Sequence, residues 1–210
     1  MKRLLAICTL LAVACLPAAV LGETWWSFLK RVDKVIGNLE DAEGEVAVSV
    51  SEVVSTAYNG LLTVPAGVRL VLEGDEASFG NMLLGNGDVT LRGKGMTVRE
   101  IKFAVDPAAK VPYQAKLTIE EGVTVESIVC AGTFQATTEI DITNHGDIKP
   151  RTNERPVHLR VTQAKGDVLL TFRNYGSIES GGEDCGMEIW GQSSGKQSIV
   201  TMYNEGVIKH

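Results

Sequence analysis

The sequence predicts an all-β solenoid of about six coils, preceded by a short amphipathic helix. Three observations lead to this prediction. Segments in the second half repeat at a fixed spacing, apolar and polar residues alternate within each segment, and a helical apolar stripe occurs only ahead of the repeats. A repeat of roughly 20 to 50 residues is typical of solenoids, propellers and arrays.

The repeat is clearest near the C-terminus, where the segments 140–148, 170–178 and 200–208 align without gaps. Within them, one asparagine and one glycine recur every 30 residues. These are Asn144, Asn174 and Asn204, and Gly146, Gly176 and Gly206. The stretch 157–161 falls on 187–191 under the same shift. The spacing therefore belongs to the whole repeating unit and not to one motif.

Each repeated segment alternates apolar and polar residues with period two, which predicts β-strands. Thirty residues hold three short strands with turns, whereas a propeller blade needs four strands and a longer repeat. Upstream, Gly67, Gly95 and Gly122 mark weaker coils of similar length. We therefore expect residues 45–210 to form about six three-sided coils, stacked to a length of about 30 Å.

The parity of the strands assigns their faces. Three apolar columns are expected inside: Ile140/Leu170/Val200, Ile142/Phe172/Met202 and Ile148/Ile178/Ile208. The asparagines share that parity and are expected to form a ladder, in which each amide bonds its copy in the next coil. Asparagine also tolerates a left-handed corner backbone, and the glycines avoid a Cβ clash at the corner. Ordinary Asn-x-Gly hairpin turns are the alternative.

The recurring Asn-x-Gly-x-Ile, together with the Val64-Pro-Ala-Gly-Val opening of the first coil, resembles right-handed parallel β-helices. That group includes pectin-lyase-like proteins and the hemagglutinin-repeat adhesins of bacterial surfaces. The resemblance covers about three quarters of the chain. It implies a right-handed coil and, for function, either surface adhesion or polysaccharide processing.

Residues 23–44 are predicted to cap the N-terminal end of the solenoid. Apolar residues from Trp25 to Leu39 recur at three- and four-residue steps, with Thr24 as N-cap and Gly37 near the end of the helix. A membrane-surface helix and a partner-docking helix are the alternatives. No comparable segment follows Ile208, so the sequence also predicts self-association through an uncapped C-terminal coil, or a fragment of a longer protein.

Residues 1–22 have the pattern of a bacterial-type signal peptide, with Lys2 and Arg3 before an apolar run from Leu4 to Leu21. The chain is therefore expected to be exported, to the extracellular space or the cell surface. The run Ala12-Val13-Ala14-Cys15 resembles a lipobox, so lipidation at Cys15 is an alternative processing route. A retained membrane anchor is a further alternative, because the run is just long enough to span a bilayer.

One outward pattern suggests a ligand-binding face. Arg160 and Trp190 share an outward column, and Tyr175 and Tyr203 are also expected to point outward. Exposed aromatic rings on a rigid sheet stack on sugar rings, whereas the apolar outward column Leu169/Ile199 suits a protein partner. The alternative is scattered surface residues with one cation–π pair.

Within the three C-terminal repeats, Glu154 and Asp184 form the only acidic column at the 30-residue spacing. They are candidates for Ca²⁺ ligands or for a catalytic acid pair, and the alternative is a solvated loop. The sequence predicts no other cofactor. Its three histidines lack metal-ligand spacing, and Cys130 is expected to be a buried small residue.

The formal net charge of −6, without a stripe of Lys and Arg, argues against nucleic-acid binding. The function we expect is that of a secreted or surface-attached, non-enzymatic solenoid that is adhesive or binds carbohydrate. A β-helical polysaccharide lyase or glycoside hydrolase is the enzymatic alternative. A structural segment of a larger surface assembly is the third.

Overall fold

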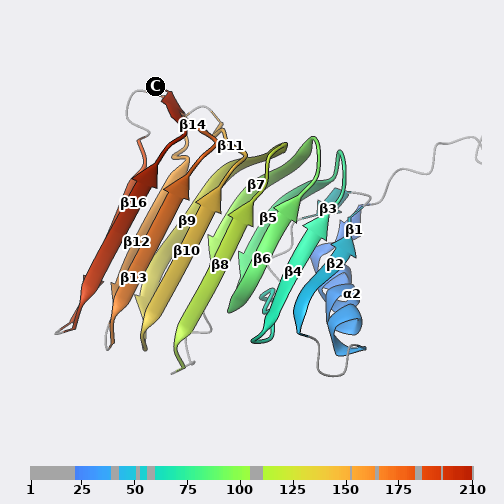
Figure 1. The fold of residues 1–210 in the computed structure, drawn as a ribbon, viewed down its shortest axis with the longest axis horizontal. Helices are drawn as coiled ribbons and strands as arrows, with labels where there is room; N and C mark the ends of the chain where they lie inside the picture. The colour runs from blue at the N-terminus through green and yellow to red at the C-terminus, as the bar shows by residue number, and fades with distance from the viewer. Residues whose placement is uncertain are drawn as a thin grey trace, which may run out of the picture.

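The structure is a computed structural model that describes residues 22–38, 43–50, 53–55, 60–104, 111–151, 153–163, 166–182, 186–194 and 196–209. Its strands wind into a parallel β-helix around one apolar core, which confirms the predicted fold class. In Figure 1 the chain rises through the front sheet, returns behind it and advances toward the C-terminal end, so the coil is right-handed. The signal-peptide prediction, Gly22 excepted, lies outside the described residues, and so does Cys15.

One side of the coil is a seven-stranded parallel sheet whose strands stack in chain order. Its members are β2 (Gly44–Ser49), β4 (Val68–Glu73), β6 (Gly87–Arg92), β8 (Tyr113–Ile119), β10 (Thr138–Asn144), β13 (Val168–Asn174) and β16 (Ser198–Asn204). The last three are in the predicted 30-residue register, with Asn144 opposite Asn174 and Asn174 opposite Asn204. Six turns of the coil separate these seven strands.

A ten-stranded parallel sheet makes the rest of the coil. Its members are β1 (Glu23–Thr24), β3 (Val53–Ser55), β5 (Ser78–Leu84), β7 (Met96–Phe103), β9 (Val123–Phe134), β11 (Asp147–Ile148), β12 (Val157–Gln163), β14 (Ser177–Glu179), β15 (Glu188–Ser193) and β17 (Val207–Lys209). The long strand β9 pairs with β11 near its start and with β12 along the remainder. From there on, each coil has two separate strands in this sheet, as the prediction of three strands per repeat requires.

After β9, the ten-stranded sheet has two separate strands per coil. At the equivalent position in the earlier coils, the strand is continuous but bends. Val98 pairs with Val125 and Glu100 pairs with Ser127, but Arg99 and Glu126 between them are skipped by the ladder. In later coils the one-residue bend is replaced by a longer connection, between β11 and β12 and again between β14 and β15. This step from bend to loop shapes the outer surface described below.

The core follows from the alternation in the sequence, because every second side chain of a strand points inward. Ile140, Ile142, Leu170 and Phe172 are all fully buried, as their column positions predict. Burial of such a side chain contributes about 1.5–3 kcal/mol relative to leaving it in water. Stacked aliphatic columns therefore hold neighbouring coils together.

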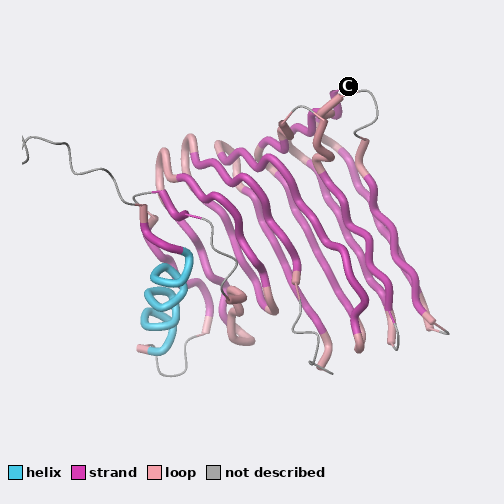
Figure 2. Tube along the Cα trace, turned by 180° about the vertical axis from the view of Figure 1, so that it is seen from behind, coloured by secondary structure: helices cyan, strands magenta, loops and turns pink. Residues whose placement is uncertain are grey.

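The helix α2 (Trp25–Gly37) lies at the N-terminal end of the stack, as Figure 2 shows. The Thr24 hydroxyl accepts a hydrogen bond from the Ser27 backbone N–H at 3.2 Å, which confirms the predicted N-cap. Phe28 is fully buried, and its ring meets that of Phe79 in β5 edge to face at 5.4 Å between centroids. The helix thus covers the first coils. Among the described residues, no helix has the length and apolar character needed to cross a membrane.

The short strand β1, immediately before α2, was not expected from the sequence. It pairs with β3, so Glu23 and Thr24 join the ten-stranded sheet before the helix begins. Two residues are too few to show a period, and only the position of β3 reveals the pairing.

The asparagine ladder has the predicted hydrogen bonds. Asn144 Nδ2 donates to Asn174 Oδ1, and Asn174 Nδ2 donates to Asn204 Oδ1, both at 2.7 Å. The prediction of a left-handed backbone at these asparagines is wrong. Among the described non-glycine residues, only Glu76 and Asn153 have positive φ. The ladder asparagines keep a strand backbone because each is the last residue of its strand.

The corner glycines are required by close approach between coils. A Cβ at Gly176 would lie 1.9 Å from Gly146 O, and one at Gly206 would lie 2.1 Å from Gly176 O. None of the three repeated corner glycines has positive φ, whereas Gly67, Gly95 and Gly122 in the earlier coils do. Glycine thus serves two purposes in this chain, left-handed turns upstream and clearance between coils downstream.

Candidate functional site

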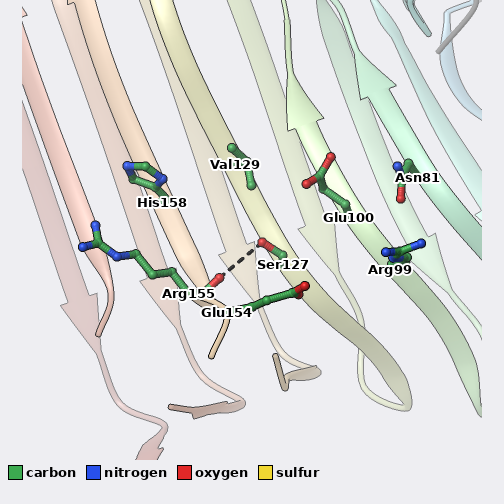
Figure 3. Close-up of a pocket in the computed structure, with 8 residues that line it drawn as sticks. All are labelled: Asn81, Arg99, Glu100, Ser127, Val129, Glu154, Arg155 and His158. Carbon is green, nitrogen blue, oxygen red and sulfur yellow. Dashed lines mark hydrogen bonds between the residues drawn. The ribbon is translucent and has the colours of Figure 1, made fainter. Parts of the chain in front are cut away.

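A polar groove of about 400 Å³ opens on the outer surface of the ten-stranded sheet, where the bend gives way to the loops. Figure 3 shows the residues that line it. They are Asn81, Arg99, Glu100, Ser127, Val129, Glu154, Arg155 and His158. Four neighbouring strands of this sheet, β5, β7, β9 and β12, and the segment before β12 therefore contribute to a single surface depression.

The bend explains why two charged neighbours in the sequence both face the groove. Val98 and Ile101 of β7 are fully buried, and Arg99 and Glu100 between them both reach the surface. Strict alternation would have turned one of the two inward. The residue skipped by the ladder restores the inward position of Ile101 and leaves an Arg and a Glu side by side.

The loop 149–156 forms the wall of the groove. Ser127 Oγ donates to the carbonyl of Arg155 at 3.2 Å, a bond drawn in Figure 3. The backbone N–H of Ile128 donates to Pro156 O at 2.9 Å, and Arg151 is 2.7 Å from Glu126. These contacts hold the described part of this segment against β9, so the wall and the floor of the groove are joined directly.

Charges of both signs meet in the groove. Arg155 forms an ion pair with Glu188 at its rim, and His158 Nε2 lies 3.5 Å from the same carboxylate. Arg99 and Glu154 have no ion-pair partner within the part of the chain that the structure describes. An unpaired guanidinium and an unpaired carboxylate are thus both available to a ligand.

Arg160 and Trp190 extend this surface along β12 and β15. They lie opposite each other in the parallel register, and the Arg160 guanidinium is 5.2 Å from the centre of the Trp190 ring. Each follows a residue at the groove by two positions, Arg160 after His158 and Trp190 after Glu188. Two residues along a strand span about 7 Å. A polar groove therefore continues directly into an exposed indole surface.

Tyr175 and Tyr203 lie together, but on a different corner of the coil. Tyr175 stacks on His145 with ring centres 4.9 Å apart and planes inclined by 8°, and Tyr203 leans on Tyr175 at 5.8 Å. This corner follows the seven-stranded sheet, whereas Trp190 belongs to the third side of the coil. The structure divides the four predicted ligand-binding residues into two separate aromatic sites.

The predicted calcium site is only partly described. Glu154 lines the groove, but Asp184 lies outside the described residues. Within the described ranges, no cluster of three or more His, Cys, Asp or Glu side chains is arranged to hold a metal ion. Calcium binding by Glu154 and Asp184 stays a prediction.

Cys130 is fully buried in β9, as expected. Burial disfavours the thiolate and raises the pKa of its thiol to about 12. A thiol that stays protonated at neutral pH is a poor nucleophile. Cys130 therefore serves the core.

Sequence reasoning had not singled out Asn81, Arg99, Glu100 or Arg155. One signal was present: adjacent Arg99 and Glu100 interrupt the alternation of 96–103, which marks a bend with two outward side chains. Their proximity to Arg155 and His158, far along the chain, depends on the coil register.

Comparison of the chain with protein-family models, with curated proteins and with solved structures gave no match.

Proposed function

We propose that this protein is an exported, non-enzymatic β-solenoid that binds carbohydrate at a cell surface. The observation that carries the proposal is the continuity of the polar groove with Trp190. The ligand would lie along β12 and β15, across successive coils.

The chemistry of this surface suits a sugar chain. Hydroxyl groups donate to carboxylates and accept from guanidinium and imidazole groups, and the groove offers Glu154, Arg99 and His158. The apolar face of a pyranose ring packs on an aromatic plane, which Trp190 provides at 37% exposure. An open groove with few apolar walls favours a polymer over a small enclosed ligand.

Arg99 points to a class of glycan. A guanidinium without an ion-pair partner forms strong charge-assisted hydrogen bonds to a carboxylate. Polysaccharides that contain uronic acids combine such carboxylates with many hydroxyl groups. We therefore expect acidic glycans to bind more tightly than their neutral counterparts.

Surface location rests on the N-terminal sequence. Lys2 and Arg3 followed by the apolar run from Leu4 to Leu21 support export, and Cys15 offers lipid attachment as a second route. Either route would deliver the solenoid to a place where polysaccharides are abundant.

A glycan array tests the binding proposal directly. The parent protein should bind a subset of acidic glycans, and Trp190→Ala should reduce that binding by about tenfold or more. Tyr175→Ala removes an aromatic ring of similar exposure on the other corner and should leave binding unchanged. Equal binding by Trp190→Ala and the parent, or no glycan binding at all, would overturn the proposal.

Hydrolysis or elimination is the second candidate, because two carboxylates, Glu100 and Glu154, line the same groove. Any glycan that binds is incubated with the protein, and new reducing ends and unsaturated products are measured. Turnover that is lost in Glu100→Gln or Glu154→Gln would establish an enzyme and refute the non-enzymatic reading. Binding without turnover supports it.

A further inference from the structure

The C-terminal end of the described solenoid exposes side chains that belong to the core. Val200, Met202 and Ile208 occupy the columns of Leu170, Phe172 and Ile178 one coil earlier. The earlier three are 1–2% exposed, whereas Val200 is 42%, Met202 52% and Ile208 56% exposed. Figure 1 shows β16 as the outermost strand at this end. A contiguous apolar surface of this kind marks an interaction site.

The edge strand β16 lacks the features that protect sheet edges. Its sequence, Ser198-Ile-Val-Thr-Met-Tyr-Asn204, contains neither a charged residue nor a proline. Each of the other six strands in the seven-stranded sheet carries at least one charged residue. Charged side chains and prolines on an edge prevent pairing with other chains, and a long edge without them favours it.

We propose that β16 pairs with β16 of a second copy of this chain, antiparallel and about a two-fold axis. The two solenoids would then join end to end and bury the exposed core side chains of both. This association is independent of the glycan-binding groove, which lies on the side of the coil.

The sequence of β16 is self-complementary in that arrangement. With the two-fold axis at Thr201, Val200 lies opposite the partner's Met202, and Ile199 lies opposite the partner's Tyr203. Inward side chains thus meet inward ones, outward side chains meet outward ones, and the pairing places no like charges together.

The other end of the molecule explains why the pairing closes as a dimer. A head-to-tail stack would need two open ends, but α2 covers the N-terminal end with Phe28 buried beneath it. Only a contact between two like ends is left, and such an isologous contact stops at two copies.

The size of the end surface sets the expected affinity. Seven residues of strand are about 24 Å long, and two sheets about 10 Å apart give an end roughly 20 Å wide. A dimer would bury about 1,000 Å² in total, at the lower limit of stable interfaces. We therefore expect a dissociation constant in the micromolar range.

Sedimentation equilibrium of the full chain between about 1 and 200 µM tests the proposal. The parent should pass from monomer to dimer in this range. Thr201→Lys places two ammonium groups together at the two-fold axis and should weaken dimerisation at least tenfold. Thr171→Lys, at the same outward position one coil inside, is the matched control and should dimerise like the parent.

A charge pair gives the decisive arm. Thr201→Lys and Thr201→Glu should each dimerise at least tenfold more weakly than the parent when alone and should form a heterodimer when mixed, because opposite charges then face each other. A parent chain that stays monomeric at 200 µM would overturn the proposal. Association that Thr201→Lys does not weaken, or that the mixture does not restore, would overturn it equally, since another surface would then be responsible.

Discussion

The two ends of this solenoid differ in what covers the core. At the N-terminal end, α2 places Trp25, Phe28 and Val32 over the first coils, and all three are buried. At the C-terminal end, Val200 and Met202 occupy core columns and remain exposed. The same kind of apolar side chain is therefore buried at one end and exposed at the other.

A stack of parallel coils leaves core side chains uncovered at both ends unless another element packs against them. Each inner coil buries its side chains against two neighbours, but an outermost coil has only one. A helix solves the problem at the N-terminal end because its amphipathic face supplies apolar side chains and satisfies its own backbone groups. The C-terminal end has an open ladder of backbone donors and acceptors, which suits another strand.

The largest expected effect compares the same kind of truncation at both ends. Phe28→Ala should destabilise the monomer by about 3–5 kcal/mol, because it leaves a cavity under the cap. Met202→Ala should cost less than about 1 kcal/mol in the monomer, since half of that side chain is already in water. Urea denaturation at low protein concentration measures both. Equal losses would contradict the distinction between a covered and an open end.

Clearance between coils gives the next effect. Gly176→Ala places a Cβ against Gly146 O, between two packed coils, and should destabilise the protein by about 3 kcal/mol. Gly37→Ala, at the end of α2 where nothing lies within 4 Å, should have almost no effect. Thermal unfolding of the two variants separates clearance from a general intolerance of alanine. A harmless Gly176→Ala would show that the coils are more loosely stacked than described.

The asparagine ladder tests the same contrast with a polar residue. Asn174→Ala leaves the buried amide of Asn144 without its 2.7 Å acceptor and should cost about 1–3 kcal/mol. Asn204→Ala removes the acceptor of Asn174 Nδ2 at the exposed end of the ladder, where water can replace it, and should cost clearly less. Chemical denaturation of both variants measures the difference. Equal losses of unfolding free energy in the two variants would contradict the expectation that inner asparagines of the ladder stabilise the protein more than the terminal one.

The smallest expected effect is a change in the pH dependence of stability, which involves Glu179 near the C-terminal end. Lys149 Nζ lies 3.1 Å from the Glu179 carboxylate, with Lys209 3.6 Å away, and this lowers the pKa of Glu179 below its ordinary value. A lowered folded-state pKa stabilises the protein above the unfolded pKa of about 4.3, and the contribution is lost as the pH falls through the folded value.

Lys149→Gln should therefore be slightly less stable than the parent at pH 7 and equal to it near pH 3. Lys34→Gln, on the exposed side of α2 at the other end, should show no such pH-dependent difference. Urea denaturation at the two pH values provides the measurement. A difference at pH 3 as large as at pH 7 would mean that Lys149 acts without Glu179.

The repeat, the strand faces, the capping helix and the asparagine ladder could all be predicted from the sequence. These features depend on residue spacing and alternation, which can be read directly from a sequence. The constant spacing of 30 residues, for example, predicts the register of Asn144, Asn174 and Asn204. The left-handed backbone was assigned wrongly because the residue type allows two conformations, and the strand ladder selected one.

The groove, in contrast, could be found only once the strands were placed in space. Arg99, Arg155 and His158 line one groove because the coil places β7, β9 and β12 side by side although they are far apart in sequence, and because a one-residue bend in β7 becomes a longer connection two coils later. The earlier coils vary in length, so their register cannot be counted along the chain. The physical reason is that regular packing between coils requires a regular sequence repeat, which can be recognised. The groove lies where that repeat is interrupted, so no repeat predicts it.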